Sequence, residues 1–441
     1  MSEYADIRIR NLSLYWFRNY LDGDVVRLLF SKRDYICIPS YIDDPDDEDS
    51  LPYTKHMYKT SVSNAKQRLD ALGYSISKFE EIFNSTIQEA IYYDSFLSHL
   101  NIDLDDYEEK SLERIERNKI TFKKWQNAMN KIIKHELDYG NILFHDKSDA
   151  KSIGINTECD KVIYYALKDD EQESYYGLRP DVIHIAYIFR LILESCNSND
   201  DILLDFSNLD AWAEDCIPKA IASTEADEKI IVLVEGKNDK SILEFALNEI
   251  YPHLSDLFYF MDFEDDHGVK RDGGTSFLIK NLKAFYFSKI KSKFIAVFDN
   301  DAEGYQSKCI LESEIKNWPN NFKIMLYPQD KFFESYPTIL PNDTICNDDI
   351  NKKACSIELY LPDSLLKESG TYYPIEWEAR KSFTIQGKKI NIYQGVITNK
   401  KTIESNFSEL KNEIIEGKQQ FIEEDWSRIK LILDSIVYAF A

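Results

Sequence analysis

Two patterns of hydrophobic and polar residues follow one another in the first half of the chain. Short stretches in which apolar and polar residues alternate predict strands at residues 6–10, 26–30 and 35–38. Over residues 61–134 the apolar residues recur at helical spacing instead. Residues 135–225 mix short strand and helix patterns. These patterns predict an α+β domain with a helical middle over residues 1–225.

Several local signals in this first half mark helix ends, a turn and a domain boundary. Gly73 lies where one helix would end, and Ser75 or Ser77 would begin the next. Residues 43–49 hold six carboxylates in seven positions, which predicts a solvated turn or insert. The polar residues 223–228 mark the expected domain boundary.

After this boundary, short buried runs alternate with helical patterns. Apolar, largely β-branched or aromatic runs predict strands at 230–234, 257–261, 294–298 and 322–327. Helical spacing predicts helices between them and another over 421–440. The order βαβαβαβ predicts an α/β fold over residues 226–441, with a doubly wound, mostly parallel sheet and a helical extension.

Composition narrows the class of protein. The chain has 441 residues, a formal net charge of −24 and 44% hydrophobic residues, which excludes a wholly disordered chain. No run of 18 apolar residues and no signal peptide is visible, so we expect a cytoplasmic protein without a membrane segment. The seven cysteines show no C-x-x-C spacing, which argues against a zinc ribbon or a disulfide scaffold.

Acidic residues follow two of the predicted parallel strands. Glu235 and Asp239 follow the first strand, and Asp299 and Asp301 follow the third. Ligands of such sheets bind at the carboxyl ends of the strands, and gathered carboxylates repel one another unless a cation neutralises them. Oxygen ligands favour Mg²⁺ or Mn²⁺ over zinc. For Glu235 and Asp239 taken alone, a helix N-terminal cap explains the pattern equally well.

Two common binding motifs do not fit these segments. An EF-hand loop beginning at Asp299 would need Glu where Ile310 stands. The GxxxxGK[ST] pattern of a P-loop ATPase is missing from the sequence.

The two acidic motifs resemble those of the Toprim domain. Residues 234–239, Val-Glu-Gly-Lys-Asn-Asp, match its Glu-Gly-x-x-Asp pattern, and residues 299–304, Asp-Asn-Asp-Ala-Glu-Gly, match Asp-x-Asp-x-x-Gly. Residues 272–276 and 282–285 resemble the connection in Toprim proteins of bacterial defence loci. Further upstream, residues 58–62 and 67–74 are similar to the HEPN/Toprim-associated N-terminal domain.

The Toprim resemblance implies a role for each matching residue. Glu235 would be a metal ligand or general acid/base, Asp299 and Asp301 would hold Mg²⁺, and Asp239 would support a metal. Ser-Ile-Glu at 356–358 resembles a later acidic motif of OLD-type nucleases, which makes Glu358 a candidate second-metal ligand. An ordinary glutamate at a helix start explains Glu358 equally well. In the same family Lys418 would be the cation that stabilises the pentacovalent phosphate, although an exposed lysine is the simpler interpretation.

The resemblance also implies partners and a setting. The function expected is a metal-dependent nuclease of bacterial anti-phage defence that acts on DNA or RNA. OLD-type nucleases carry a fused ATPase, so an ATPase or sensor in trans or a homo-oligomer is expected here. Residues 270–299 carry seven basic residues against two acidic ones. Their lysines could cradle the nucleic-acid backbone; they are Lys280, Lys283, Lys289, Lys291 and Lys293.

Two alternatives stay open. The Toprim fold also serves as a non-catalytic scaffold that binds nucleic acid. Arg179 and His184 fit the R-x4-6-H spacing of HEPN ribonucleases, which need no metal, although a capped or packed histidine at a helix start is the commoner explanation. The hydrolytic interpretation requires that Glu235 lie within reach of Asp299 and Asp301, with no lysine ammonium between them.

Overall fold

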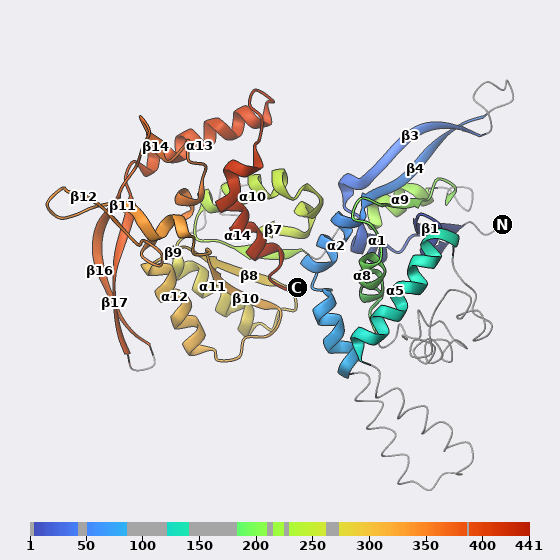
Figure 1. Cartoon of the computed structure of the whole chain (residues 1–441), viewed down its shortest axis with the longest axis horizontal. Coiled ribbons are helices and arrows are strands. Elements are labelled where there is room, and N and C mark those ends of the chain that lie inside the picture. The colour runs from blue at the N-terminus through green and yellow to red at the C-terminus, as the bar shows by residue number, and fades with distance from the viewer. Residues whose placement is uncertain are drawn as a thin grey trace, which may run out of the picture. The chain divides into compact units, whose positions relative to one another are not determined.

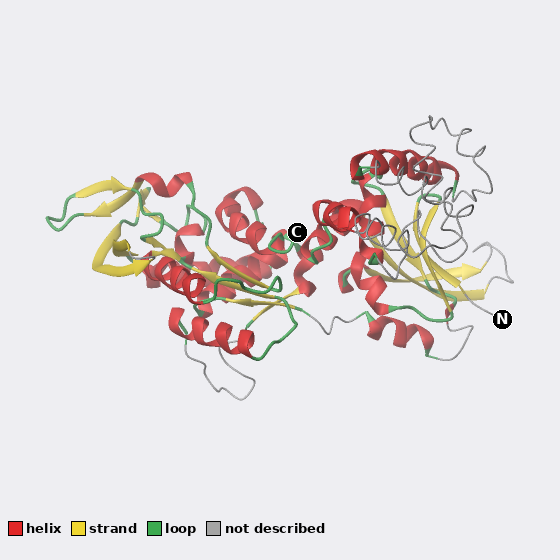
Figure 2. Cartoon of the chain, turned by 90° about the horizontal axis from the view of Figure 1, so that it is seen from below, coloured by secondary structure: helices red, strands yellow, loops and turns green. Residues whose placement is uncertain are grey.

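The structure of the protein is a computed structural model, which describes residues 4–42, 51–85, 121–140, 183–209, 215–224, 229–261, 273–385 and 388–441. The chain divides into two compact units, Met1–Ala226 and Asp227–Phe440 (Figure 1). Each unit combines strands and helices (Figure 2). We describe each unit by itself.

The N-terminal unit is built on a five-stranded antiparallel sheet with the order β2-β1-β5-β4-β3. Its strands are β1 (Tyr4–Ile9), β2 (Leu12–Arg18), β3 (Tyr35–Ile42), β4 (Leu51–Ser61) and β5 (Asp201–Asp205). In β5, Ile202 and Leu204 are buried, and the residues on either side of them are exposed. This period of two is typical of a sheet that is covered by protein on one face.

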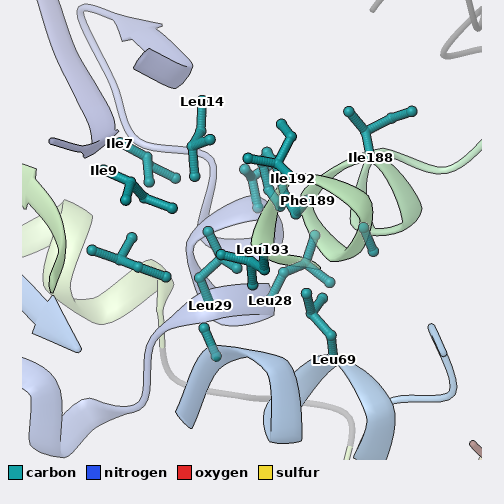
Figure 3. Close-up of a cluster of buried hydrophobic side chains, with 14 of the residues drawn as sticks. Ile7, Ile9, Leu14, Leu28, Leu29, Leu69, Ile188, Phe189, Ile192 and Leu193 are labelled. Atoms are coloured by element: carbon teal, nitrogen blue, oxygen red, sulfur yellow. The ribbon is translucent and has the colours of Figure 1, made fainter. Parts of the chain in front are cut away.

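Helices supply the other half of this core. They are α1 (Gly23–Leu29), α2 (Val62–Ala71), residues 76–85, α5 (Phe122–Tyr139), α8 (Ile185–Glu194) and α9 (Cys216–Ser223). Figure 3 shows side chains of β1 and β2 directed toward those of α1, α2 and α8, including Ile7, Leu29, Leu69 and Phe189. Each of these four side chains is almost completely buried, so the unit has one continuous apolar core.

One strand prediction in this unit is wrong. Residues 26–30, which we expected to be a strand, lie largely in helix α1. The Asp22 side chain caps this helix by accepting the Asp24 backbone N–H at 2.9 Å. Val25, Val26 and Leu29 are buried on one side of it, a spacing that fits a helix as well as a short strand. The N-terminal cap by Asp22 favours the helix over the strand.

The end of helix α2 and the start of the next helix agree with the sequence pattern. Gly73 has φ +89°, a left-handed conformation that ends α2 without strain. The Ser75 hydroxyl accepts the backbone N–H of Lys78 at 3.3 Å, as the cap of the next helix would. The acidic run 43–49 lies outside the described residues.

The C-terminal unit contains a four-stranded parallel sheet with the order β10-β8-β6-β7. Its elements are β6 (Ile230–Leu233), α10 (Lys237–Ile250), β7 (Phe258–Phe260), α11 (Thr275–Phe287), β8 (Phe294–Phe298), α12 (Ala302–Glu314) and β10 (Phe322–Leu326). From β6 the chain first adds β7 on one side and then β8 on the other. The strand order therefore reverses between β6 and β8, and right-handed crossovers put α10 on the opposite face from α11 and α12 (Figure 1).

A second, mixed sheet of this unit has the order β12-β11-β16-β17. Its strands are β11 (Tyr336–Ile339), β12 (Ile345–Asp348), β16 (Ile375–Ile385) and β17 (Lys388–Ile397). The remaining elements of this unit are β9 (Asn300–Asp301), β13 (Ala354–Cys355), β14 (Lys367–Glu368), β15 (Thr371–Tyr372), α13 (Lys400–Ile415), α14 (Ser427–Val437) and the 3-10 helices η3 (Pro252–Leu257), η4 (Lys331–Ser335), η5 (Ile357–Tyr360) and η6 (Glu423–Trp426). The N-terminal unit also contains a 3-10 helix, η1 (Lys32–Asp34). The fold is thus mixed α/β, and the second sheet is an addition that the sequence pattern did not predict.

Two further findings concern the whole described chain. None of its helices combines the length and the apolar character that crossing a membrane requires. The cysteines that lie in the described ranges are all free thiols.

Candidate functional site

Acidic residues meet where the order of the parallel strands reverses. Glu235 follows β6, and Asp299 follows β8, its direct neighbour in the sheet. A Glu235 carboxylate oxygen accepts the backbone N–H of Asp299 at 3.0 Å. The two strand ends are therefore joined, and Glu235 lies within reach of the Asp299 segment as the interpretation requires. A crevice at such a reversal is the usual place for a ligand in an open α/β sheet.

Asp301 is held in place by the start of helix α12 and by the second sheet. Its carboxylate caps α12 by accepting the Gly304 backbone N–H at 2.7 Å, and its other oxygen accepts the Gln394 side-chain amide at 2.6 Å. The β9 segment also pairs with β13. A Cβ on Gly304 would collide with the carbonyl oxygen of Asp299, so glycine at this position lets the helix approach the strand end.

The Asp299 carboxyl group lies among the other acids of this site. Burial, followed by the negative charges of Glu235, Asp239, Asp301 and Glu358, raises its pKa well above the usual value. Its Oδ1 is buried and has no hydrogen-bond partner in the described part of the chain. A buried carboxylate oxygen among like charges is costly unless a proton or a cation joins it.

Glu235 shares this environment. Burial and the nearby charge of Asp301 raise the pKa of Glu235 to about 8, against the lowering effect of the Asp299 N–H. Burial likewise raises the pKa of Asp301, although its hydrogen bond from Gly304 opposes the shift. The strand ends thus gather carboxyl groups that ionise reluctantly because they are buried together.

Asp239 extends the site along helix α10. It lies in the first turn of the helix and is buried. The Tyr327 hydroxyl, which follows β10, donates to Asp239 Oδ1 at 2.5 Å. Burial raises the pKa of Asp239 to about 6, while the Tyr327 hydrogen bond lowers it and Glu358 raises it again. A simple helix cap does not account for a carboxylate that is buried against another acid.

Glu358 reaches the site from the 3-10 helix η5. Its side chain is 1% exposed and accepts the Ser356 hydroxyl at 2.6 Å. The ammonium of Lys400, at the start of α13, binds its other oxygen at 3.1 Å. Although burial alone would lower the pKa of Lys400, the charges of Glu358, Asp299 and Asp239 raise it. Glu358 also lines a polar cavity of about 280 Å³.

Lys400 and Gln394 are site residues that the sequence analysis missed. Both belong to the second sheet and the helix that follows it. No local motif marks them, because they reach the acids only after β17 pairs with β16 and approaches β13. The Lys400 ammonium binds Glu358, and Asp299 Oδ1 has no hydrogen-bond partner in the part of the chain that the structure describes. This lysine therefore does not fill the place of a cation beside Asp299.

The donor set fits a hard divalent cation. In the described ranges, no group of three or more His, Cys, Asp or Glu side chains forms a preformed ligand cage. Mg²⁺ does not need such a cage, because it is commonly bound by one or two carboxylates and keeps waters that substrate phosphates replace. Asp299 Oδ1 and the nearby carboxyl groups of Glu235 and Asp301 could supply these one or two carboxylate ligands.

The structure places the remaining predicted residues elsewhere. Lys418 is 68% exposed on the surface and pairs with Glu416. Lys280 is exposed on α11, and Lys283 on the same helix pairs with Glu314. The other three predicted lysines precede β8 and so lie at the amino edge of the sheet, opposite the acids; they are Lys289, Lys291 and Lys293. A five-residue strand separates the two edges by about 16 Å.

The residues of the alternative ribonuclease site are only partly described. Arg179 lies outside the described residues. His184 is the N-cap of α8, where its Nδ1 accepts the Ala186 backbone N–H at 3.3 Å. Its ring stacks on Tyr74 with a centroid distance of 4.9 Å, and burial lowers its pKa. His184 therefore has a complete structural role as a capping and packing residue.

The comparisons with known proteins bear on the first unit of the chain. A family model described as "HEPN/Toprim N-terminal domain 1" matches residues 1–225. The predicted resemblance of residues 58–62 and 67–74 falls inside this match, on β4 and α2. No curated protein and no solved structure gives a significant match.

Proposed function

The chain belongs to the HEPN/Toprim N-terminal domain 1 family, and we propose that its C-terminal unit is a Toprim-like, divalent-metal-dependent nuclease that hydrolyses phosphodiester bonds. The family description fits a nuclease-related protein. The observation that carries the proposal is Asp299 Oδ1, a buried carboxylate oxygen that has no hydrogen-bond partner among the described residues and lies near four further acids. Such an arrangement is costly in a purely structural role.

In this proposal Glu235, Asp299 and Asp301 hold Mg²⁺ or Mn²⁺, and Asp239 and Glu358 support a second ion. When bound, the ions would activate a water and neutralise the oxygen that leaves. The protein keeps its own ligands in place, because Asp299 N–H fixes Glu235, and Gly304 and Gln394 fix Asp301. Tyr327 orients Asp239 in the same way.

We assign the phosphate-stabilising cation to Lys400 rather than to Lys418. Lys400 reaches Glu358 at 3.1 Å and is influenced by the charges of Asp299 and Asp239. A fixed cation there can balance negative charge that develops on the attacked phosphate. Lys418 instead is exposed and pairs with Glu416.

The first test measures cleavage of plasmid DNA and of RNA with Mg²⁺, Mn²⁺ or a chelator. Wild-type protein should cut at least one substrate only when the metal is present. Glu235→Gln and Asp299→Asn should each lose at least about 100-fold in rate, since each removes a charge that the metal needs. Glu312→Gln, an exposed acid on α12 that pairs with Lys308, is the matched control and should keep its activity.

A second readout separates catalysis from metal binding. Calorimetric titration with Mn²⁺ should detect binding to wild type and to Glu312→Gln, and weaker binding to Asp299→Asn. If wild type binds Mn²⁺ and nucleic acid but cuts neither substrate, the scaffold alternative replaces the nuclease. If Asp299→Asn binds Mn²⁺ as tightly as wild type does, the metal site is wrongly placed.

The resemblance to Toprim proteins of bacterial defence loci extends the proposal to protection against phage, with a sensor or ATPase partner in trans or a second copy of this chain. Plaque counts on cells that express wild type or Asp299→Asn test this setting. Protection by wild type and its loss in the variant would support it, and equal plaque counts would contradict it.

A further inference from the structure

The amino edge of the parallel sheet holds a pocket that the acidic site does not use. We call it the amino-edge pocket. It has a volume of about 590 Å³ and opens between the segments that lead into β8 and β10. Its lining combines aromatic, basic and amide side chains; these include Tyr286, Phe287, Lys289, Lys291, Asn321 and Phe322.

The charge around this pocket opposes that of the protein as a whole. The chain carries a net charge of −24, yet the segments 285–293 and 315–323 contain no Asp or Glu. Together these segments hold five lysines, which are Lys289, Lys291, Lys293, Lys316 and Lys323. Lys289 and Lys291 line the pocket, whereas the ammonium groups of Lys293 and Lys323 lie over the ring of Phe440, at 5.2 and 5.4 Å from its centroid. Since the segments precede two adjacent parallel strands, their charges gather at one edge. Such a local excess selects an anionic ligand.

An exposed aromatic ring stands beside these lysines. Phe287 is 73% exposed, and its neighbour in the pocket, Ile290, is 37% exposed. The Asn321 amide donates to the carbonyl oxygens of Ile290 and Ser292 at 3.0 and 2.9 Å, which fixes the loop that carries the lysines. A flat apolar ring next to fixed cations suits a ligand with both a π-face and phosphates.

The backbone at Lys289 adds an independent sign. Helix α11 ends in two hydrogen bonds, from Lys289 N–H to Tyr286 O at 3.0 Å and from Ile290 N–H to Phe285 O at 3.3 Å. This Schellman pattern places Lys289 at φ +54°, a position where glycine is favoured. A glycine at this position would therefore relieve the backbone, while the lysine places its ammonium at the edge of the pocket.

We propose that the amino-edge pocket binds single-stranded nucleic acid, with a base stacked on Phe287 and phosphates beside Lys289 and Lys291. The inference rests on the proposed function in that nucleic acid is the substrate. It adds a second contact, about one strand length from the acids, that holds the unpaired part of a substrate strand.

The test measures binding alone, in chelator, by fluorescence anisotropy with the full-length protein. The probes are labelled 12-nucleotide strands of oligo-dT and oligo-U and an abasic strand with the same phosphates. Phe287→Ala should weaken binding of the two base-containing strands about ten-fold and leave the abasic strand unchanged, because only stacking is lost. Lys289→Gln/Lys291→Gln should weaken all three strands and reduce the salt dependence of log Kd by roughly 1.4.

Two control variants accompany this binding measurement. Lys123→Gln/Lys124→Gln removes the same charge from exposed positions of α5 and should bind like wild type. Lys289→Gly suits the local backbone, so its unfolding temperature should equal or exceed that of wild type while binding of all strands weakens.

The possible results distinguish the two proposals. Equal binding of base-containing strands by wild type and Phe287→Ala would overturn the stacking site. A lysine double variant no weaker than the α5 control would overturn the pocket altogether. Tight, Phe287-dependent binding by a protein that never cuts with any metal would uphold the pocket and refute the nuclease.

Discussion

Two groups of buried charged residues, one in each unit of this chain, are arranged in opposite ways. In the N-terminal unit Arg190 donates to Asp70 at 2.8 Å and also pairs with Glu194. In the C-terminal unit Glu235 and Asp299 face further acids, and one oxygen of Asp299 has no hydrogen-bond partner within the described ranges of the chain. Opposite charges that satisfy one another stabilise a fold, whereas like charges that are held together need something from outside.

The difference teaches how to separate framework from site within one chain. Arg68 is 1% exposed, and its Nε donates to the carbonyl oxygen of Arg27 at 2.7 Å, so even a fully buried guanidinium is bonded in the first unit. Changes to such residues should cost stability. Changes to the acids of the second unit should cost activity and leave the fold intact. The following predictions test this division.

The largest effect is expected at Lys400. Lys400→Gln removes the fixed cation beside Glu358, so we expect the cleavage rate at saturating metal to fall about 100- to 1000-fold. Lys418→Gln should change the rate less than about two-fold, because an exposed ion pair contributes little. Single-turnover rates of both variants, with thermal melts to confirm folding, measure the contrast. A larger loss in Lys418→Gln would restore the assignment made from the sequence.

The next effect concerns the framework. Arg190→Met would leave Asp70 without this partner and Glu194 with Lys66 alone, at partly buried positions, so we expect a loss of about 3 kcal/mol in the free energy of unfolding. Lys78→Met removes an exposed pair with Glu81 and should cost less than about 0.5 kcal/mol. Urea titrations compare the two. If Arg190→Met leaves the free energy of unfolding unchanged, the paired charges do not support the fold.

The parallel strands and their acids could be predicted from the sequence because both signals are local. Apolar runs at 230–234 and 294–298 specify buried strands, and acids directly after them must meet at one edge. The strand prediction for the short run 26–30 is wrong because a few apolar residues fit a helix and a strand equally well.

The rest of the site depends on contacts between distant residues. Glu358 is near Asp239 and Asp299 because β13 pairs with β9, fifty residues earlier in the chain. Lys400 follows a long hairpin whose strands carry many polar residues, so no apolar run in the sequence predicts these strands or the position of Lys400. Lys293 is close to Asp299 in sequence, yet the extended strand β8 puts the two at opposite edges.

The pH dependence of stability should have opposite signs in the two units of the metal-free protein. The pKa of Glu235 is raised from 4.5 to about 8, so its stabilising proton is lost and the second unit weakens as the pH rises through this window. Although burial opposes the effect, Arg190 and Lys66 lower the pKa of Glu194, so the first unit weakens as the pH falls below 4.5.

Urea unfolding followed by hydrogen-exchange mass spectrometry resolves peptides of each unit and so measures this contrast. Glu235→Gln should reduce the response of the second unit between pH 5 and pH 8, to which Asp239 and Asp299 also contribute, and leave that of the first unit unchanged. Mg²⁺ should restore the stability of wild type at pH 8 more than at pH 5. Parallel responses of the two units would contradict the division between them.

The smallest effect is expected at His184, the residue of the first unit that most resembles a catalytic group in sequence. His184→Ala removes the cap of α8 and the stacking on Tyr74, which should cost about 1 kcal/mol in unfolding free energy. Metal-dependent cleavage should be unchanged, because Nδ1 of His184 already accepts a hydrogen bond from the Ala186 backbone N–H. Cleavage of RNA in chelator, lost in a folded His184→Ala, would reverse the comparison and move the chemistry to the N-terminal unit.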